Sequence, residues 1–437
     1  MTAGIDRPAI ETRLAEAGLP PLRRSAWIEV DLEALEGNLR AIGTMTGGLP
    51  AMPVVKADAY GHGMVPVART LEAAGAAALC VATLDEAVAL RDAGVESPLL
   101  VLYPIPPAEV AAAIRLQVAV AAGSGAALDA LLAAAAATGS ARGLSLELEV
   151  ETGLGRGGVP AEEVVAAAER ILAAGARLGG VWSHLQEAEV ESITTEQVRR
   201  YEAALAALRA AGVEIPRRHL AASAAILLGN VPRYDAVRPG LITYGLIPDE
   251  LAPASFGPSS FVAGADGLRP VLSLCARPVR VADLPVGHGV SYGPTWRAPR
   301  PSRIATLPIG YGDGWPRSLS NRGAAIVRGM RVPVVGNVAM DATMVDVTDV
   351  PGPPVTVDDE VVLIGRQGPG AIAAGDVARW RTTNSWEVVT SMSARLTRVY
   401  DAPAGIVGTR ALSPLETSWL GSSSGTATSS ISRSTRS

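Results

Sequence analysis

Two patterns of hydrophobic and polar residues divide the chain near residue 250. Before it, short β-rich apolar runs alternate with longer segments in which apolar residues recur at i, i+3, i+4 and i+7, as on one face of a helix. The short runs predict strands at 51–57, 78–82, 98–103, 117–121, 144–150, 179–184, 218–223 and 235–240. Helical segments such as 84–94, 161–175 and 197–212 lie between them and end at Gly, a frequent helix stop.

This alternation favours an α/β fold. Strand–helix units repeated over roughly 200 residues fit a (β/α)8 barrel of the TIM type. An open, doubly wound sheet is the alternative. It is less favoured because no Gly-x-Gly-x-x-Gly motif follows the first predicted strand.

The second half predicts a mainly β domain. Its apolar runs are short, Pro and Gly punctuate them, and long helical patterns are nearly absent. Residues 27–32, ahead of the first barrel helix, are a candidate strand of the same domain. The predicted organisation is an N-terminal extension, a barrel, a Pro/Gly/Ser-rich linker, a β domain and a disordered tail, at 1–24, 25–250, 251–270, 271–405 and 413–437.

Composition narrows the class of protein. A hydrophobic content of 48% supplies a sizeable core and excludes a largely disordered chain, and a net charge of -5 disfavours nucleic-acid or anionic-membrane partners. Two cysteines cannot form a disulfide framework or a multi-cysteine metal site. We find neither a secretory signal nor an apolar membrane span, so we expect a cytoplasmic protein without a metal.

One residue type is used only once. The chain has 38 Lys and Arg residues, and Lys56 is the sole lysine. Arginine does not deprotonate at useful pH and cannot attack a carbonyl as an amine. Lys56 is therefore either a leftover surface charge or the residue that supplies a primary amine.

The position of Lys56 favours a reactive amine. It ends the first predicted barrel strand, and barrel enzymes place catalytic groups at the carboxyl ends of their strands. A desolvated amine near other cations loses its proton readily and can form a Schiff base. Tyr60 follows closely, whereas His62, between two glycines, is interpreted as structural rather than catalytic.

The segment Pro-Val-Val-Lys-Ala-Asp-Ala-Tyr-Gly-His-Gly (53–63) resembles the signature of the alanine racemase family, and the similarity runs from about residue 25 to 402. The family combines a barrel with a β domain and uses pyridoxal 5′-phosphate (PLP). The resemblance implies that Lys56 holds PLP covalently and acts as one of two catalytic bases. It also implies that Tyr60 contacts the cofactor phosphate.

Further barrel segments extend this resemblance. Arg156, in 148–159, matches the arginine that contacts the PLP phenolic oxygen and the substrate. Many family members carry a lysine, often carbamylated, where this chain has Glu149. We predict that the Glu149 carboxylate orients Arg156 as a permanent anion; the alternative is an outward-facing strand residue.

The family also implies roles at three later strand ends. His184 would stack under the PLP ring, and Arg238 would face the pyridine nitrogen. Because arginine keeps its proton, that nitrogen would stay unprotonated and side reactions such as transamination would be disfavoured. Ser223, Gly240 and Leu241 would bind the phosphate, at loops where barrels often hold it.

The remaining predicted residues follow the linker. By resemblance, Tyr292 is the second catalytic base, and Tyr311, Met340 and Asp341 approach the barrel mouth of the other subunit of a homodimer. Trp386 replaces a family tyrosine that touches the phosphate and borders the substrate. Further departures from the family are Ala222, Pro294 and Ala339.

The activity implied is interconversion of L- and D-alanine by two-base proton exchange at Cα. Three alternatives remain open at this point: a racemase or epimerase for another small amino acid, a PLP-dependent decarboxylase, and a PLP-binding protein without turnover.

Overall fold

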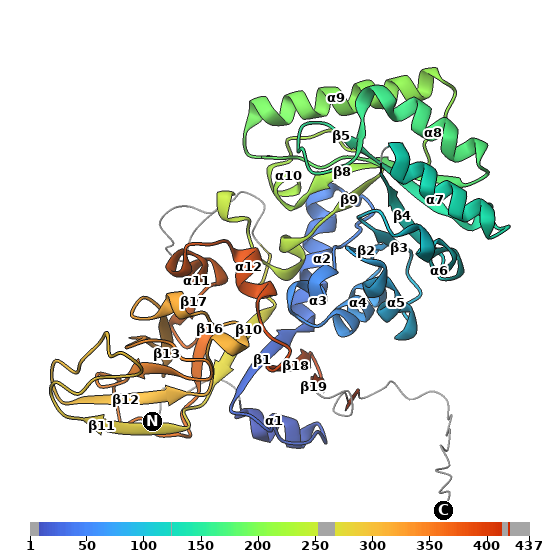
Figure 1. The fold of residues 1–437 in the computed structure, drawn as a ribbon. Coiled ribbons are helices and arrows are strands. Elements are labelled where there is room, and N and C mark those ends of the chain that lie inside the picture. Colours follow the sequence, from blue (N-terminus) through green and yellow to red (C-terminus); the bar gives the residue numbers. More distant parts are fainter. Residues whose placement is uncertain (1–7, 124, 252–266, 413–417, 420–437) are drawn as a thin grey trace, which may run out of the picture.

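The computed structural model describes residues 8–123, 125–251, 267–412 and 418–419 (Figure 1). Most of the predicted linker and tail lies outside these residues. Seven strands of the first half form one parallel sheet that curls into a barrel: β2 (Leu79–Val81), β3 (Leu99–Val101), β4 (Val118–Ala122), β5 (Ser145–Glu151), β7 (Arg177–Trp182), β8 (Arg218–Ala222) and β9 (Ala236–Arg238). The short β6 (Val159–Pro160) pairs with β5.

The segment before Lys56 closes this barrel without forming a full strand. Ala51 bridges to Val237 on β9, and Val54 bridges to Cys80 on β2, both in parallel. Pro53 has no N–H to donate to a ladder, and the backbone turns left-handed after Lys56. The (β/α)8-type barrel is confirmed, but the predicted strand 51–57 contributes only these bridges.

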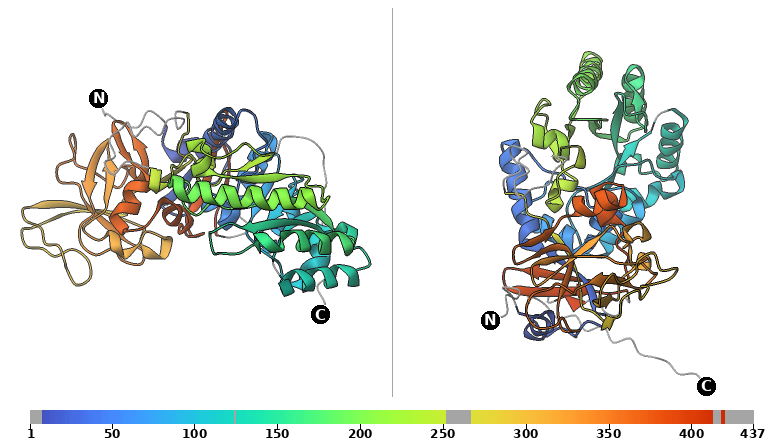
Figure 2. Two further views of the ribbon diagram at one scale, coloured as in Figure 1. Left: turned by 90° about the horizontal axis from the view of Figure 1, so that it is seen from above. Right: turned by 90° about the vertical axis from the view of Figure 1, so that its left-hand side faces the viewer.

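Helices cover the outside of the barrel (Figure 2). The sequence explains their ends: Asp31 caps the second helix by accepting from Ala34 N, and Thr83 and Glu86 form a capping box on the fifth. The helices of this half are α2 (Leu32–Thr46), α3 (Lys56–Tyr60), α4 (Met64–Ala73), α5 (Leu84–Asp92), α6 (Val110–Arg115), α7 (Gly125–Ala137), α8 (Val164–Ala173), α9 (Glu191–Ala210) and α10 (Ser223–Leu228), and the starts of α3 and α10 lie at the barrel mouth.

The second half is mainly β, as predicted. Its larger sheet has the order β14-β13-β16-β10-β1-β18-β19-β20, with β17 pairing with β16, and β11-β12-β15 form a smaller antiparallel sheet. The strands are β10 (Leu272–Ala276), β11 (Arg280–Leu284), β12 (Ser302–Leu307), β13 (Ala324–Val327), β14 (Met330–Pro333), β15 (Thr343–Asp346), β16 (Val361–Gln367), β17 (Gly370–Ile372), β18 (Thr397–Ala402), β19 (Gly405–Arg410) and β20 (Ser418–Trp419).

The two halves are joined by an early strand and by late helices. β1 (Ala26–Asp31) pairs antiparallel with β10 and parallel with β18, so this strand belongs to the β domain although it precedes the barrel in the sequence. α12 (Ser385–Thr390) packs against α3 beside the barrel mouth. The other helices are α1 (Ile10–Glu16) and α11 (Ala374–Arg381), and the short 3-10 turns are Pro107–Glu109, Ala141–Gly143, Ala161–Glu163, Leu241–Tyr244, Asp249–Leu251, Tyr311–Asp313 and Arg317–Leu319.

One hydrophobic core runs through both halves. It includes Val30 of β1, Leu146 of the barrel and Leu363 of the β domain, so the barrel and the larger sheet share buried apolar side chains. Within the described ranges, no helix is both long and apolar enough to cross a membrane.

Candidate active site

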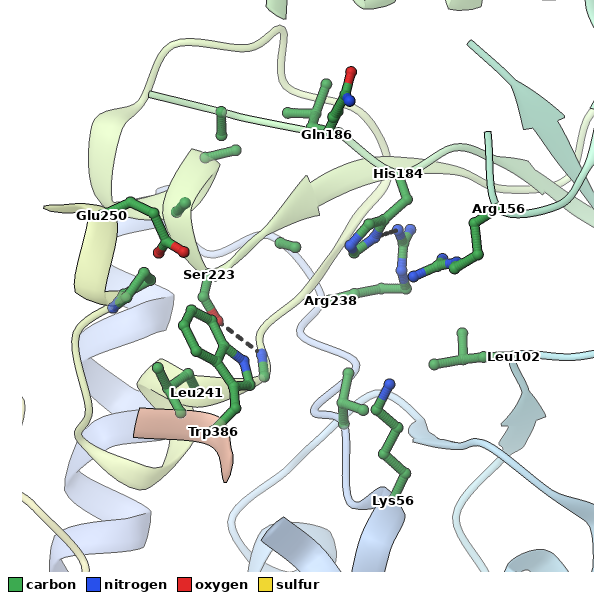
Figure 3. Close-up of a pocket in the computed structure, with 18 of the residues that line it drawn as sticks. Lys56, Leu102, Arg156, His184, Gln186, Ser223, Arg238, Leu241, Glu250 and Trp386 are labelled. Atoms are coloured by element: carbon green, nitrogen blue, oxygen red, sulfur yellow. Dashed lines mark hydrogen bonds between the residues drawn. The ribbon is translucent and has the colours of Figure 1, made fainter. Parts of the chain in front are cut away.

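A pocket of about 670 Å³ opens at the carboxyl ends of the barrel strands. Several sequence-predicted residues meet there, and Figure 3 shows most of them pointing into one space. The predicted residues that line it are Lys56, Tyr60, Arg156, His184, Ser223, Arg238, Gly240, Leu241 and Trp386.

Lys56 projects into this pocket from the start of α3 (Figure 3). Burial and then the Arg156 guanidinium lower the pKa of its amine, while Glu86 and Cys80 act in the opposite direction. A partly desolvated amine with a lowered pKa is a better nucleophile at neutral pH. Its environment therefore favours covalent chemistry over a role as a surface charge.

The backbone after Lys56 has an unusual conformation. Ala57, Asp58, Ala59 and Tyr60 all have positive φ, between 53° and 55°, which costs L-residues about 1–2 kcal/mol each. Such a turn persists only where its surroundings hold it.

Two arginines of the β domain stabilise this turn through hydrogen bonds. Asp58 accepts hydrogen bonds from Met64 N at 2.8 Å and from Arg410 Nη1 at 2.6 Å. The Gly61 carbonyl accepts from Nε and Nη2 of the buried Arg398, at 3.1 and 2.9 Å. The β domain therefore fixes the loop that carries Lys56.

A group of polar donors faces the pocket at strands β8 and β9. The Ser223 hydroxyl accepts from Gly240 N at 3.0 Å and from Ile242 N at 3.4 Å. A Cβ on Gly240 would lie 2.8 Å from the Tyr60 hydroxyl, so glycine lets these groups converge. Hydroxyls and backbone N–H groups in such a cradle suit an anion.

Arg238 is buried beneath the pocket. Its Nη2 donates to the Ser183 carbonyl at 2.7 Å, its Nη1 donates to His219 Nδ1 at 2.5 Å, and its guanidinium lies 4.6 Å from the Trp182 ring centroid. His184 Nδ1 lies 3.4 Å from Arg238 Nη2. Burial and then the charge of Arg238 lower the pKa of His184 to about 3, so this imidazole is neutral.

A second layer behind Arg238 was not predicted. Because Arg238 donates to His219 Nδ1, the His219 proton is on Nε2, where it donates to Glu147 Oε2 at 2.7 Å. Glu147 also pairs with Arg217 at 2.5 Å. The signals in the sequence were Glu147 in the apolar strand 144–150 and His219 in the predicted strand 218–223. Neither residue type specifies a buried partner by itself.

Glu149 contacts the predicted arginine. Its Oε1 lies 3.4 Å from Arg156 Nη2, and the Arg156 Cζ lies 5.7 Å from the ring centroid of Tyr103. Burial raises the pKa of Glu149 and the charge of Arg156 opposes that rise. Glu149 lies behind Arg156 and is not a lining residue of the pocket.

The predicted residues of the β domain lie apart from this pocket. Tyr292, Tyr311 and Met340 are 76%, 44% and 52% exposed. Asp341 pairs with Arg395 at 2.6 Å. The described part of a single chain therefore does not bring these four residues to Lys56.

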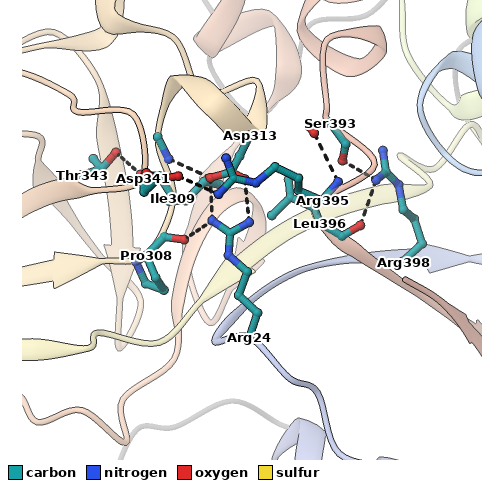
Figure 4. A network of polar contacts seen from close by, with 11 residues as sticks. Arg24, Pro308, Ile309, Asp313, Asp341, Thr343, Ser393, Arg395, Leu396 and Arg398 are labelled. Atoms are coloured by element: carbon teal, nitrogen blue, oxygen red, sulfur yellow. Dashed lines mark hydrogen bonds and ion pairs between the residues drawn. The ribbon is translucent and has the colours of Figure 1, made fainter. Parts of the chain in front are cut away.

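Arg395 belongs to a network that braces this edge of the β domain (Figure 4). Its Nε lies 3.4 Å from the buried Asp313 carboxylate. Arg24 pairs with the same carboxylate at 2.5 Å and donates to the Pro308 carbonyl. The segment ahead of β1 is thereby tied to the turn that carries Tyr311.

His62 lies in the core, outside the pocket. Its Nδ1 is 2.9 Å from both the Ala59 and Tyr60 carbonyls, and burial lowers its pKa to about 4. It braces the left-handed turn, which supports its structural interpretation.

Comparison with known proteins gives one family. Residues 30–248 match the model "Alanine racemase, N-terminal domain" and residues 271–400 match "Alanine racemase, C-terminal domain". The alanine racemase of Symbiobacterium thermophilum is 42% identical over 382 residues, which cover 86% of this chain and 97% of that protein.

Solved structures give the same answer. The structure of Bacillus anthracis alanine racemase with bound L-Ala-P superposes with a TM-score of 0.80 at 34% identity, covering 89% of this chain and 98% of that one. The structure of Bartonella henselae alanine racemase with covalently bound pyridoxal phosphate has a TM-score of 0.75 at 27% identity, covering 87% and 100%.

Proposed function

The chain belongs to the alanine racemase family, and we propose that it interconverts L- and D-alanine with PLP held at Lys56. It is an isomerase of the amino-acid racemase class. The observation that supports the cofactor assignment best is the convergence of the sole lysine with Arg238 and the Ser223 cradle in one pocket.

The residues of the pocket fit PLP. Ser223, Tyr60 and the N–H groups of Gly240 and Leu241 suit the phosphate dianion. Lys56 supplies the amine for the aldehyde, and Arg238, always protonated, suits an unprotonated ring nitrogen. Trp386 borders the same space from α12. When bound, PLP delocalises the electron pair left on Cα as its proton departs.

The protein then binds the amino acid and moves its proton. Arg156, oriented by Glu149, holds the substrate through charge-assisted hydrogen bonds. Lys56 acts as base on one face of Cα, for the D-isomer, and Tyr292 acts on the other face, for the L-isomer.

This assignment requires two chains. Tyr292 is 76% exposed and lies outside the pocket of its own chain. We propose a homodimer in which Tyr292, Tyr311, Met340 and Asp341 complete the pocket of the other subunit. The exposure of the Tyr292, Tyr311 and Met340 side chains, which are residue types enriched at protein–protein interfaces, supports such a contact.

We also propose a cytoplasmic setting for the protein. Cys80 and Cys275 are both buried, and two cysteines are too few for the disulfide framework typical of small secreted proteins.

Incubation of the protein with PLP and single L-amino acids, followed by chiral analysis, tests the activity. We expect D-alanine to form from L-alanine. A larger rate of racemisation with another small amino acid would make that amino acid the preferred substrate instead of alanine. A decarboxylated product would support a PLP-dependent decarboxylase, and no turnover of any amino acid would support a PLP-binding protein without catalysis. Borohydride reduction followed by peptide mass spectrometry should locate PLP on Lys56, and Lys56→Ala should lose it.

The second base is tested by the same assay in deuterated water. Tyr292→Phe should retain PLP but lose exchange of the L-alanine Cα proton. Tyr311→Phe is the matched control, because it removes a phenol hydroxyl from the same proposed dimer contact. It should keep exchange of the L-alanine Cα proton. Unchanged exchange in Tyr292→Phe would remove Tyr292 from the reaction.

A further inference from the structure

Glu86 connects the lysine turn to the neighbouring strand and helix. Its Oε1 accepts from Ala57 N, the residue after Lys56, at 2.6 Å. Its Oε2 accepts from Ala82 N at 2.8 Å and from Thr83 N at 3.3 Å, where β2 ends and α5 begins. One carboxylate therefore ties the backbone of Lys56 to the capping box of α5.

This contact bears on a strained position. Ala57 is the first residue of the left-handed turn, so its N–H fixes the direction in which the chain leaves Lys56. A capping-box glutamate ordinarily needs only the N–H at its own helix start. The additional bond to Ala57 goes beyond capping α5.

The charge of Glu86 also acts on the amine. Among the groups that face Lys56, Arg156 from the loop after β5 lowers the pKa of the amine, whereas Glu86 from α5 and Cys80 from β2 raise it. His184 at the end of β7 is neutral. Glu86 is the carboxylate that offsets part of the effect of burial and Arg156.

We propose that Glu86 is a positioning residue for Lys56: its carboxylate fixes the backbone that carries the amine and supplies a negative charge that acts on that amine. This inference rests on the proposed role of Lys56 in holding the cofactor. It adds a residue outside the lining of the pocket to the machinery that sets the lysine's orientation and protonation.

The single lysine makes a direct test possible. The full chain, produced with lysine labelled with ¹³C at Cε and freed of cofactor, gives one lysine side-chain signal by NMR because Lys56 is the sole lysine. The pH dependence of that signal reports the pKa of the Lys56 amine. The readout does not depend on turnover or on bound PLP.

Glu86→Gln is compared with a matched control, Glu72→Gln. Glu72 on α4 likewise accepts two backbone N–H groups, from Glu96 at 2.8 Å and Ser97 at 2.5 Å. Neither of these belongs to the lysine turn, and Glu72 is not among the groups that act on the Lys56 amine. We expect the titration midpoint of Lys56 to fall by about one unit in Glu86→Gln. We expect it to be unchanged in Glu72→Gln.

Glu86→Asp keeps the charge but shortens the reach, and we expect a smaller fall than with Gln. If Glu86→Gln does not fold, Glu86→Asp carries the test. A wild-type midpoint in any folded Glu86 variant would overturn the proposal. Failure of the wild-type chain to attach PLP would instead overturn the proposed function, since the NMR midpoint is measured without cofactor.

Discussion

Arg410 on β19 forms a two-pronged ion pair with Asp58, which lies two positions after Lys56 and 352 residues earlier in the chain. The contact joins the last long strand of the β domain to the strained turn of the barrel. It helps to hold the left-handed residues 57–60 in place, although none of them is glycine.

Asp58→Asn should lower the free energy of unfolding by about 1–2 kcal/mol at pH 7, since the pair is only partly buried. Burial raises the pKa of Asp58, but the hydrogen bond and charge of Arg410 outweigh it and hold that pKa below its usual value. The contribution is therefore full above the unfolded pKa of about 3.9 and is lost as the pH falls through the folded pKa.

Urea unfolding at pH 7 and at low pH measures this effect. The gap between wild type and Asp58→Asn should narrow below about pH 4. Asp129→Asn, which breaks the exposed pair with Arg170, is the control and should change little. A gap that stays constant down to pH 3 would rule out the ionic origin.

Gly61→Ala should destabilise the protein strongly. Gly61 has a φ of 80°, and an added Cβ would lie 2.1 Å from the Val389 carbonyl oxygen on α12. We expect a loss of about 3 kcal/mol or more in the free energy of unfolding, because the clashing atom belongs to the backbone of α12 and that helix would have to shift. Gly48→Ala has a similar φ of 83° but nothing within 4 Å of the new Cβ, so about 1 kcal/mol is expected. Equal losses would mean that the clash is relieved elsewhere.

Glu147→Gln should disrupt the layer behind Arg238. The carboxylate is fully buried and accepts from both His219 and Arg217, whereas an amide would turn a donor toward one of them. We expect a loss of about 3 kcal/mol in the free energy of unfolding at pH 7. Glu169→Gln, an exposed carboxylate on α8, should change it by less than about 0.5 kcal/mol.

The pH dependence of this contribution has a defined sign. Burial raises the pKa of Glu147, but the interactions with His219 and Arg217 outweigh burial and lower that pKa to about 2. The stabilisation is present above the unfolded carboxyl pKa of about 4.3 and is lost as the pH falls toward 2. Denaturant titrations between pH 7 and pH 3 should show the difference from Glu147→Gln shrinking. A difference that grows with acid would contradict this sign.

Trp386→Tyr should broaden the substrate range. The indole lines the pocket from α12, and a smaller phenol leaves more room beside the substrate. We expect kcat/KM for a bulkier amino acid such as serine to rise about tenfold relative to alanine. Trp380→Tyr, on the neighbouring α11 and packed by Arg331 outside the pocket, should leave that ratio unchanged. An unchanged ratio in Trp386→Tyr would show that the indole does not limit the substrate.

The pattern of apolar residues was sufficient to predict the barrel, because the short apolar runs of its strands differ from the i, i+3, i+4, i+7 spacing of its helices. The predicted strand 51–57 forms only isolated bridges. Pro53 interrupts the ladder, and Ala57 adopts a conformation that its residue type does not indicate. Lys56 could be singled out because no other lysine exists.

Long-range polar contacts could not be predicted. Glu86, Asp58 and Glu147 are ordinary acidic residues in the sequence, and their roles depend on partners that folding brings from distant segments. The predicted residues of the β domain lie on the surface of a single chain. Their proposed role needs a second subunit, which no pattern within one chain can place.

The handedness of the turn after Lys56 has a stereochemical consequence. For a D-residue, a φ near +55° is the ordinary helical region, and the penalty paid by L-residues there disappears. Chemical ligation that installs D-alanine at positions 57 and 59 should therefore preserve the backbone path and make the folded state more stable. In the loop that carries its own reactive amine, a chain of the racemase family offers two positions where the mirror image of alanine fits better than the natural enantiomer.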